Sequence, residues 1–446
     1  MAAPRALVRH FLYPLYERLR GRRTLRHFRR MQRHDRMTAE ELGEVHDRLL
    51  VEHLRRAARH VPFYREHVDA DDIRSPADLA RFPILDKPMI REAGDKLRSE
   101  AWRGRAWSME TGGSSGEPLL FVTDSERESS AQACKLRARA WWGLHPGHRE
   151  TDLWGSPIET GRQDLARRVA QGVLGYQLLS AFRLNEETMG DFRARLAGGR
   201  ADFIYGYPSA MATYARFLEA RGEDLADVGL RVAITTAETL LPQDDAVIRR
   251  VFACPVANEY GCRDGALIAH AGPDGHMRLM HDAVHVEVLG PDLEPVAPGE
   301  EGEVALTNFH AASFPLIRYR IGDLITLSPD ADPTDNPHPV VAAVKGRTTD
   351  LLVHQDGSRV HALAVIYPLR EMSGVDRFRC TQTSRSHVRV EVIPGVSFDA
   401  QSGPASITDG VRRALGADMK VDVALVEELE PLPSGKHRYV VCDVDV

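Results

Sequence analysis

The stretch of sequence that decides the fold is an eight-residue run with three glycines and three hydroxyl side chains, Thr111-Gly112-Gly113-Ser114-Ser115-Gly116-Glu117-Pro118. Glycine lets backbone N–H groups approach a ligand and point the same way, and Ser and Thr hydroxyls add donors that rotate toward phosphate oxygens. The run therefore predicts a phosphate-binding loop, with an ordinary flexible loop as the alternative. It has neither the Gly-Lys-Ser/Thr ending of a Walker A motif nor the spacing of a dinucleotide-binding fingerprint, so the two commonest phosphate loops are excluded.

Five further motifs follow this loop along the chain. They are Ala237-Glu238-Thr239, Asn258-Glu259-Tyr260-Gly261, Arg318-Tyr319-Arg320-Ile321-Gly322-Asp323, Gly346-Arg347-Thr348-Thr349-Asp350 and Pro433-Ser434-Gly435-Lys436. In this order and spacing they resemble the core motifs of adenylate-forming enzymes, the acyl- and aryl-CoA synthetase superfamily.

Within that superfamily the chain resembles the phenylacetate-CoA ligase branch, which includes capsule-biosynthesis relatives. Leu119 stands where many acyl-CoA synthetases carry a lysine after the proline of the loop. Three other marks are His60-Val61-Pro62-Phe63-Tyr64-Arg65, Phe82-Pro83-Ile84-Leu85-Asp86-Lys87 and Tyr205-Gly206-Tyr207-Pro208-Ser209. The resemblance runs from about residue 50 to the C-terminus and therefore covers most of the chain.

This resemblance implies an α/β protein with a large N-terminal adenylate-forming domain and a mobile α+β C-terminal lid domain. The large domain is expected to combine mixed α/β layers with a small β subdomain. The expected boundaries are a basic arm over 1–36, the AMP-binding domain over 37–345 with its β subdomain at about 282–345, and the lid over 346–446.

The resemblance also implies an enzyme that uses ATP to convert a carboxylic acid into an acyl adenylate and pyrophosphate. The acyl group then passes to a thiol, with coenzyme A as the expected acceptor and an aromatic or hydrophobic acid as the expected substrate. A carboxylate is a poor acyl donor because its leaving group would be oxide, whereas the adenylate supplies AMP. Transfer at phosphorus depends mainly on positioning and on cations, here with Mg²⁺ as the expected metal.

The resemblance assigns roles residue by residue. Residues Thr111 to Gly116 would hold the β- and γ-phosphates, and Lys436 would bridge the substrate carboxylate and the α-phosphate. Asp323 would accept hydrogen bonds from the ribose hydroxyls, which an ionised carboxylate does readily. The adenine would be lined, with Tyr260 on its face, by Ala237, Glu238, Thr239, Asn258, Glu259, Tyr260 and Gly261. Arg347 would also contact the nucleotide, and Thr349 and Asp350 would form the hinge.

Lys436 has support from composition as well. The chain holds six lysines against 52 arginines, so a lysine stands where arginine is the usual basic residue. A compact ammonium fits between two anions more readily than a planar guanidinium fork. The alternative is a solvated lysine near the C-terminus, although Pro433-Ser434-Gly435 predicts a turn that presents it from a loop.

Two positions depart from the family pattern. Where the family has Tyr-Gly-x-x-Glu, this chain has Asp264, so the carboxylate expected to bind Mg²⁺ is one methylene shorter. Because Mg²⁺ usually keeps several waters, the shorter reach can be bridged. At the hinge, Thr349 replaces the usual first acidic residue and only Asp350 is retained. Domain rotation is still expected, with a different balance between its states.

The sequence says less about the acid substrate and the acceptor of the acyl group. Trp142, Tyr205, Gly206 and Tyr207, with Trp141, stand where the family's acyl pocket is expected, and core packing is the alternative for these aromatic residues. Relatives pass the acyl group to coenzyme A, to a carrier protein or to an amine. A non-catalytic nucleotide-binding scaffold is a further alternative, supported only by the changes at Asp264 and Thr349.

Hydrophobic periodicity supports the implied fold. Thr38-Ala39-Glu40-Glu41 has the form of a capping box and predicts a helix that runs to about Val61 and stops near Pro62. Between Val122 and Phe252, predicted helices alternate with short apolar runs, which favours α/β layers with mostly parallel strands. These helices are expected over 125–142, 185–197 and 209–220, and the strands over 203–205 and 232–235. Antiparallel strands are expected over 284–289, 302–306 and 324–327, and lid elements over 387–392, 407–415 and 421–426.

Length and charge add constraints. At 446 residues with 43% hydrophobic residues, the chain is expected to form two or more domains. Residues 1–36 contain eleven arginines against Glu17 and Asp35, a net charge of +9, which leaves −15 on the rest of the chain. Apolar residues interleave with these arginines at helical spacing, so the arm predicts either a weak membrane-surface contact or, preferably, a helix packed on its own acidic body. Nothing else indicates nucleic-acid binding, and a homodimer stays open.

The five cysteines are scattered and odd in number, which favours neither a disulfide framework nor a standard metal motif. The sequence has no run of about 18 apolar residues and no secretory signal pattern. A reducing cytoplasm is therefore the expected location.

Overall fold

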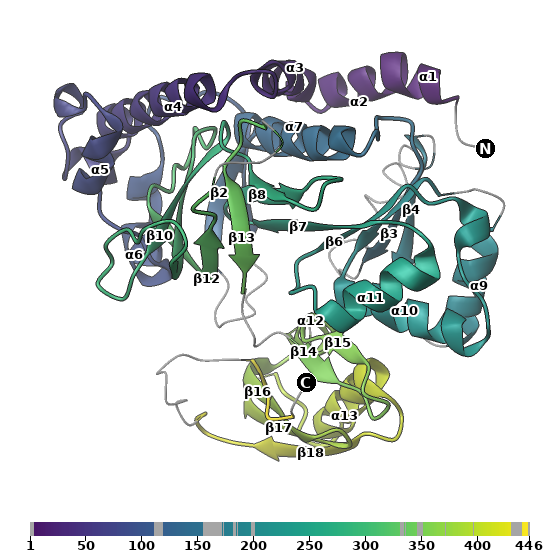
Figure 1. The fold of residues 1–446 in the computed structure, drawn as a ribbon. Coiled ribbons are helices and arrows are strands. Elements are labelled where there is room, and N and C mark those ends of the chain that lie inside the picture. Colours follow the sequence, from purple (N-terminus) through teal and green to yellow (C-terminus); the bar gives the residue numbers. More distant parts are fainter. Residues whose placement is uncertain are drawn as a thin grey trace.

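The structure, a computed structural model, describes residues 4–110, 119–154, 172, 174–181, 184, 186–197, 201–330, 334, 336–345, 351–370, 372–395, 397–429 and 439–444. One large sheet with helices around it forms most of the molecule, and a smaller body of strands and helices at the C-terminal end lies below it in Figure 1. This arrangement places the N-terminal helices and the C-terminal body at opposite ends of the molecule.

Helices dominate the N-terminal region. They are α1 (Arg5–Leu7), the π-helical turn η1 (Val8–Leu12), α2 (Tyr13–Leu19), α3 (Thr24–His34), α4 (Ala39–His60), α5 (Pro62–Arg65), η2 (Ala70–Asp72), η3 (Pro76–Arg81), α6 (Lys87–Ala93) and η4 (Gly94–Leu97). The predicted capping box is present, because the Thr38 hydroxyl accepts from the Glu41 amide (3.2 Å) and the Thr38 amide donates to the Glu41 carboxylate (2.8 Å). Helix α4 ends before Pro62, which has no N–H to continue it, so the predicted start and end are both confirmed.

Five parallel strands form one half of the main sheet, in the order β4, β3, β5, β6, β7. They are β3 (Glu150–Trp154), β4 (Tyr176–Ser180), β5 (Phe203–Gly206), β6 (Val232–Thr236) and β7 (Val256–Cys262). The helices that accompany them are α7 (Ser125–Trp141), α9 (Glu186–Leu196), α10 (Pro208–Ala220) and α11 (Pro242–Phe252), with the short η6 (Ala226–Val228). The predicted alternation of helices and parallel strands is confirmed.

The same sheet continues through six antiparallel strands, in the order β8, β9, β13, β12, β11, β10. They are β8 (Ala266–Ala271), β9 (Met277–Leu279), β10 (Val284–Leu289), β11 (Glu301–Asn308), β12 (Tyr319–Leu327) and β13 (Val340–Val344). The predicted antiparallel strands are present, and they extend the parallel half without a break. A separate antiparallel pair, β1 (Ala106–Glu110) with β2 (Leu120–Asp124), flanks the glycine-rich loop.

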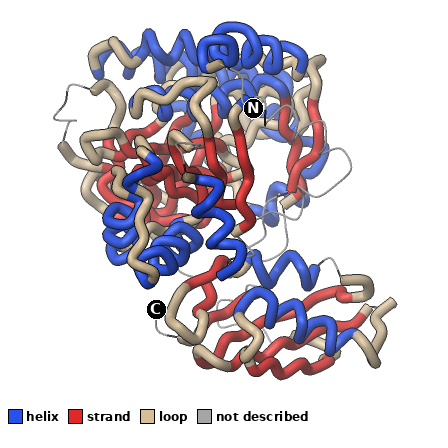
Figure 2. Tube along the Cα trace, turned by 90° about the vertical axis from the view of Figure 1, so that its right-hand side faces the viewer, coloured by secondary structure: helices blue, strands red, loops and turns tan. Residues whose placement is uncertain are grey.

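The C-terminal body has its own sheet and its own apolar core. Its elements are β14 (Leu351–Val353), β15 (Arg359–His361), α12 (Leu363–Arg370), β16 (Val375–Ser384), β17 (His387–Pro394), α13 (Gly403–Leu415), β18 (Lys420–Leu425) and β19 (Val440–Cys442). Four of the strands pair in the order β18, β17, β16, β19, and α12 and α13 lie against them (Figure 2). The predicted elements at 387–392, 407–415 and 421–426 are confirmed.

A buried ion pair ties the N-terminal helices to the sheet. The Arg137 guanidinium lies 2.8 Å from the Asp282 carboxylate, with both side chains fully buried, and His34 of α3 contacts the same carboxylate at 2.7 Å. Nearer the N-terminus, Arg22 pairs with Glu128 at 2.7 Å and His27 with Glu126 at 2.8 Å. Helix α3 thus packs on acidic groups of α7. The sequence favoured such packing of the basic arm on the acidic body. No helix in the described ranges is long and apolar enough to span a membrane.

Three histidines meet where α4 packs against the start of β10. The Nδ1 of His46 donates to the carbonyl oxygen of His281 (2.6 Å), and its Nε2 lies 2.8 Å from Nδ1 of His285. The rings of His46 and His281 stack at 3.7 Å. Burial and the neighbouring His46 lower the pKa of His281 to about 2 and the pKa of His285 to about 3. These rings are therefore neutral in the folded protein.

We expect acid to destabilise this fold. A histidine with a depressed folded-state pKa takes up a proton on unfolding, so its stabilising effect is complete above its unfolded pKa of about 6.5 and declines as the pH falls toward the folded value. Each such histidine should cost about 1.4 kcal/mol per pH unit below about 6.5. In urea titrations at several pH values, His285→Gln should lessen this dependence, because one proton fewer is taken up. His67→Gln, at an exposed histidine, should leave it unchanged. Equal slopes for His285→Gln and the parent would contradict the assignment.

Candidate functional site

The predicted nucleotide motifs lie at the carboxyl ends of neighbouring parallel strands. In the pairing of β5 with β6, Gly206 is opposite Thr235, and in the pairing of β6 with β7, Thr236 is opposite Glu259. Ala237 directly follows β6, and Asn258 to Gly261 lie within β7. In open α/β sheets, ligands bind at this edge. The structure therefore brings three separate motif segments to one edge of the sheet.

Two glycines are required by close approaches of the backbone at this edge. A Cβ atom on Gly206 would lie 2.1 Å from the carbonyl oxygen of Leu153 on β3. A Cβ atom on Gly261 would lie 2.5 Å from the carbonyl oxygen of Ala266, where β7 turns back into β8. Both contacts are with backbone and cannot be relieved by a side-chain rotation. The two positions thus set the tight packing of the strand ends.

Ala237 and Glu238 shape the segment after β6. Ala237 has φ +68°, a left-handed backbone conformation that is unusual for alanine. The next carboxylate, Glu238, accepts from the backbone N–H of Ser209 (3.1 Å) and from its hydroxyl (3.0 Å). A carboxylate at this place offsets the unpaired N–H groups and the positive end of the helix dipole of α10. Glu238 therefore joins the two segments that follow β5 and β6.

Tyr260 and Asp323 connect the predicted adenine and ribose motifs. The Tyr260 hydroxyl donates to Oδ2 of Asp323 at 3.2 Å. Asp323 lies on β12, in which Gly322 has φ +85°, and the register of β12 with β11 shifts between Glu303 and Ala305. A ladder irregularity bends a strand and re-aims its side chains. Two motifs 63 residues apart are thereby brought into direct contact.

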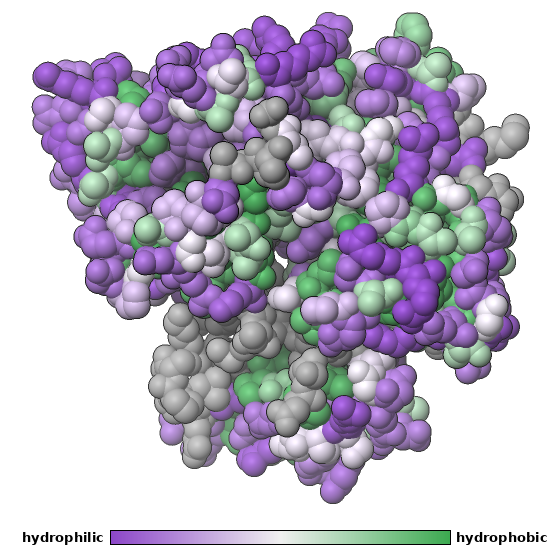
Figure 3. Space-filling view, in the orientation of Figure 1, coloured by the Kyte–Doolittle hydropathy of each residue, from purple (hydrophilic) through white to green (hydrophobic). Residues whose placement is uncertain are grey.

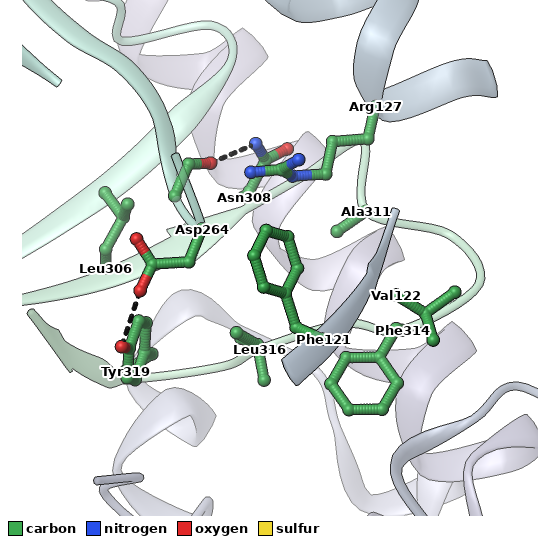
Figure 4. A pocket seen from close by; sticks show the side chains of 11 residues that line it. Phe121, Val122, Arg127, Asp264, Leu306, Asn308, Ala311, Phe314, Leu316 and Tyr319 are labelled. Atoms are coloured by element: carbon green, nitrogen blue, oxygen red, sulfur yellow. Dashed lines mark hydrogen bonds between the residues drawn. The ribbon is translucent and has the colours of Figure 1, made fainter. Parts of the chain in front are cut away.

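Asp264 lies in the turn between β7 and β8, and three other elements hold this turn. The Tyr319 hydroxyl donates to Asp264 Oδ2 (2.6 Å), the Asn308 amide to the Gly265 carbonyl (2.7 Å), and Arg127 to the Arg263 carbonyl (2.7 Å). Figure 4 shows Tyr319 and Asn308 reaching the turn from opposite sides. Tyr319 and Asn308 border a pocket beside this turn. The pocket is lined by Phe121, Val122, Arg127, Asp264, Gly265, Leu306, Asn308, Ala311, Phe314, Leu316 and Tyr319.

The Asp264 carboxylate is half-buried and contributes to a site with few other metal ligands. Within the described residues, no cluster of three or more His, Cys, Asp or Glu side chains could hold a metal ion by itself. Mg²⁺ in enzymes that use nucleotides is commonly held by one or two carboxylates, waters and the phosphates of the substrate. Asp264 is thus the carboxylate in this pocket that could contribute to a Mg²⁺ site of this kind.

The predicted acyl-pocket residues divide into two groups. Tyr205 and Tyr207 both pack on Trp154, with ring centroids 5.9 and 4.3 Å apart. Trp142 instead donates its indole N–H to the carbonyl oxygen of Ala271 (2.9 Å). Trp154 ends β3 and was not selected from the sequence, because the preceding Glu150-Thr151-Asp152-Leu153 is not an apolar run that would mark a buried strand. The aromatic wall at the strand ends thus consists of Tyr205, Tyr207 and Trp154.

A buried polar network below this wall was also missed from the sequence. The Tyr205 hydroxyl donates to Glu259 (2.8 Å), and the Lys135 ammonium lies 3.4 Å from the same hydroxyl. Burial alone would raise the pKa of Glu259, but the charge of Lys135, the neighbouring His270 and the Tyr205 hydrogen bond bring this pKa below its usual value. Glu259 is therefore ionised at neutral pH. Since lysine is rare in this chain, the composition that singled out Lys436 also marks Lys135.

A second buried carboxyl belongs to the same region. Asp152 on β3 is opposite Tyr205 on β5 and accepts from the Tyr176 hydroxyl at 2.6 Å. Burial, and then the charge of Glu150, raise the pKa of Asp152 well above its usual value. Asp152 and Glu259 are thus two buried carboxyl groups next to Tyr205, and their pKa values are shifted in opposite directions.

Several predicted residues lie outside the described residues. They are Thr111, Gly112, Gly113, Ser114, Ser115, Gly116, Arg347, Thr349, Asp350 and Lys436. For the glycine-rich loop the flanks are described, and Glu110 of β1 is opposite Leu120 of β2. The loop therefore connects two paired antiparallel strands.

Comparison with known proteins gives one family model and several relatives. Residues 352–443 match the CapK C-terminal domain. Protein CapK of Staphylococcus aureus is 20% identical over 415 residues, which is 91% of this chain and 90% of that protein. The phenylacetate-coenzyme A ligase of Aromatoleum evansii is 27% identical over 319 residues, 67% of this chain and 69% of that protein. The chain is a homologue of CapK and of the phenylacetate-CoA ligases.

Solved structures agree with this relationship at the level of the fold. A crystal structure of 2-hydroxyisobutyryl-CoA ligase, in complex with 2-HIB-AMP and CoA in the thioesterification state, aligns with a TM-score of 0.62. It covers 93% of this chain and 92% of the ligase, at 19% identity. The resemblance predicted from the motifs and the predicted α/β fold class with a C-terminal domain are therefore confirmed. The relatives also support the predicted enzyme class, an adenylate-forming ligase.

We expect Gly206→Ala to disrupt the site edge. The added methyl group would meet the backbone of β3 at 2.1 Å, so β3 and β5 would have to separate. A loss of about 2 kcal/mol or more in unfolding free energy is expected, at the upper part of the range for overpacking. Gly190→Ala in α9 is the matched control, because no atom lies within 4 Å of its Cβ position. That variant should be neutral or more stable by up to about 1 kcal/mol. Equal stability of the two variants in urea unfolding would contradict the close approach.

Proposed function

We propose that this protein is an ATP-dependent carboxylate ligase that forms an acyl adenylate and then transfers the acyl group to the thiol of coenzyme A. The observation that carries the proposal is the contact between Tyr260 and Asp323, which joins the adenine and ribose motifs at the edge where the β5 and β6 segments end. Homologues named phenylacetate-coenzyme A ligase support the same chemistry.

The first step joins the acid to AMP. A carboxylate oxygen attacks the α-phosphorus of ATP, the bond to the β-phosphate oxygen breaks, and pyrophosphate leaves. In our proposal the hydroxyls and N–H groups of Thr111 to Gly116 bind the β- and γ-phosphates, and Lys436 neutralises the charge between the carboxylate and the α-phosphate. Asp323 accepts from the ribose, and Tyr260, Glu238 and Asn258 border the adenine.

Asp264 is the residue that would hold Mg²⁺ together with the phosphates. Its Oδ2 accepts from Tyr319, which fixes the carboxylate in the turn after β7. When bound, the ion supplies charge neutralisation at the phosphates. The carboxylate is one methylene shorter than the family's glutamate, so we propose that a water bridges the remaining distance.

The second step exchanges AMP for a thiol. The thiol sulfur attacks the acyl carbon, the bond to the AMP oxygen breaks, and the thiol proton leaves to solvent or to a base. We propose that residues 346–446 act as the lid, that Thr349 and Asp350 form its hinge, and that Arg347 contacts the nucleotide. The reducing cytoplasm proposed for this reaction accords with the five cysteines, which are all free thiols.

We propose an aromatic or hydrophobic acid as the substrate. Tyr205, Tyr207 and Trp154 present an aromatic wall at the strand ends, and such walls favour flat or apolar ligands. Next to this wall the ionised Glu259 and the Lys135 ammonium contact the Tyr205 hydroxyl, and we propose that they recognise a polar substituent of the substrate.

One observation keeps a different acceptor open. The CapK alignment covers 91% of this chain, whereas the alignments with two phenylacetate-coenzyme A ligases cover 67% and 71%, and the C-terminal match is to CapK. The alignment with CapK is thus longer than those with the coenzyme A ligases, so we keep a carrier protein or an amine as the second candidate acceptor. Incubating preformed adenylate with coenzyme A, with a phosphopantetheine carrier and with amines distinguishes the three, since only the true acceptor speeds the release of AMP.

The test of adenylation is ATP–pyrophosphate exchange dependent on a carboxylic acid, measured over aryl, arylacetic and fatty acids without an acceptor. We expect one acid class to support exchange, with a requirement for Mg²⁺. Lys436→Ala should lower the exchange rate by about 100-fold or more, because a charge placed against the transition state is removed.

The matched control is Lys420→Ala, at an exposed lysine on β18 of the same body. It should keep the parental exchange rate. Absence of exchange with every acid, despite saturable ATP binding, would contradict the ligase proposal and favour a nucleotide-binding scaffold.

A further inference from the structure

The N-terminal helical run exposes a stripe of large apolar side chains. Helices α1 and α2, joined by the π-helical turn η1, form one run over residues 5–19. Along it, at intervals of four residues, lie Leu7 (43% exposed), Phe11 (67%), Leu15 (53%) and Leu19 (78%). A π-helix has more residues per turn than an α-helix, so a four-residue interval through both kinds of turn stays on one face. We call these four side chains the apolar stripe.

The apolar stripe is unusual for this molecule. The described residues include nine exposed large hydrophobic side chains, and four of them belong to this single run. Isolated exposed leucines are normal on protein surfaces, whereas a contiguous exposed row marks an interaction site. Figure 3 shows apolar surface among hydrophilic surface at the upper right edge, over the outer end of this run.

The opposite face of the run is fixed to the body. Val8 is buried, and Glu17 is buried against Thr24 and Arg22. Arg5 forms an ion pair with Asp202, next to β5, and its carbonyl oxygen packs against Gly147. The run is therefore packed on the rest of the fold through one face. Its other face, which carries the apolar stripe, is exposed to solvent.

The surroundings of the apolar stripe are strongly basic. Among the described residues, the arginine ion pairs of the arm use Arg5, Arg22 and Arg23. Seven other arginines are exposed and form no ion pair with a residue that the structure describes: Arg9, Arg18, Arg20, Arg26, Arg29, Arg33 and Arg36. Arg18 lies three residues after Leu15 and is therefore its neighbour on the helix surface, at the border of the apolar stripe.

We propose that the apolar stripe and these exposed arginines dock this protein onto an anionic lipid surface, with the run lying in the plane of the interface. A helix with one apolar face and flanking basic residues binds in this way, because its apolar side chains enter the acyl boundary while its cations meet the headgroups. This inference does not depend on the proposed ligase activity.

Charge favours lipid over the other occupants. A second copy of the chain that paired symmetrically through this face would bring a +9 arm against another +9 arm, which like-charge repulsion opposes. A nucleic acid or another polyanion would engage the arginines but would leave the apolar side chains without a partner. Only a surface that is both anionic and apolar satisfies both halves of the face.

Docking through this run is compatible with access to the candidate site. Figure 1 shows the run at the top of the molecule and the C-terminal body, β14 to β19, at the bottom. A membrane against the outer face of α1 and α2 would therefore leave the C-terminal body facing away from the lipid.

The test is vesicle flotation of the full-length protein. Vesicles of phosphatidylcholine alone are compared with vesicles that contain about one third phosphatidylglycerol. We expect binding to the anionic vesicles only. The double variant Phe11→Ser/Leu15→Ser should weaken this binding by about tenfold, and Arg9→Gln/Arg18→Gln should weaken it and reduce its dependence on salt.

The matched control removes two exposed leucines elsewhere, Leu178→Ser/Leu425→Ser, and should bind as the parent does. Because Phe11 and Leu15 are exposed, thermal unfolding of their double variant should match the parent, which separates docking from folding. Three results would overturn the proposal: no vesicle binding, binding unaffected by Phe11→Ser/Leu15→Ser, or a dimer that this variant converts to a monomer. Binding to heparin that is as tight as binding to vesicles and independent of Phe11 and Leu15 would also overturn it, in favour of a polyanion.

Discussion

The position of β7 between a parallel and an antiparallel neighbour is the constraint on which the rest of the structure depends. β7 pairs in parallel with β6 and antiparallel with β8, so the sheet changes character at this strand. Its central residues, Asn258 and Glu259, share the edge of the candidate site with β5 and β6, and its last residues turn toward the antiparallel half. Residues 258–264 therefore lie where the parallel and antiparallel halves of the sheet join.

This junction explains why distant motifs meet. The parallel half supplies strand ends, loops and the N-terminus of α10, whereas the antiparallel half supplies Tyr319 and Asp323 from β12. Tyr319 reaches Asp264 and Asp323 meets Tyr260, so each half holds a carboxylate with a tyrosine. Neutral hydroxyl donors fix the two carboxylates without neutralising them, which keeps both available to a cationic or hydroxyl-bearing ligand.

Local signals in the sequence predicted much of the fold. The capping box at Thr38, the stop at Pro62 and the amphipathic helices correspond to structured elements, because each depends on residues close together in the chain. The continuity of the sheet could not be predicted in the same way. β8 and β9 are short, and their pairing with β7 and β13 depends on contacts between distant segments.

The candidate site shows the same division. Motif spacing predicted Glu259, Tyr260, Asp264 and Asp323, which the structure gathers at one edge. It could not indicate Trp154 or Lys135, since their importance lies in contacts across strands and helices with Tyr205. The arm gives a third case, because its charge was evident from composition. Only the structure shows that some of its arginines form ion pairs with the body while others lie on an exposed face.

The most direct test of this account is amide hydrogen exchange of the full-length protein, measured with and without ATP and Mg²⁺. If the nucleotide is bound where β7 and β12 meet, protection should rise in peptides covering residues 256–264 and 319–327, while residues 24–34 of α3 exchange as before. Saturable ATP binding that leaves both β7 and β12 unprotected would contradict the central claim that these two strands hold the nucleotide.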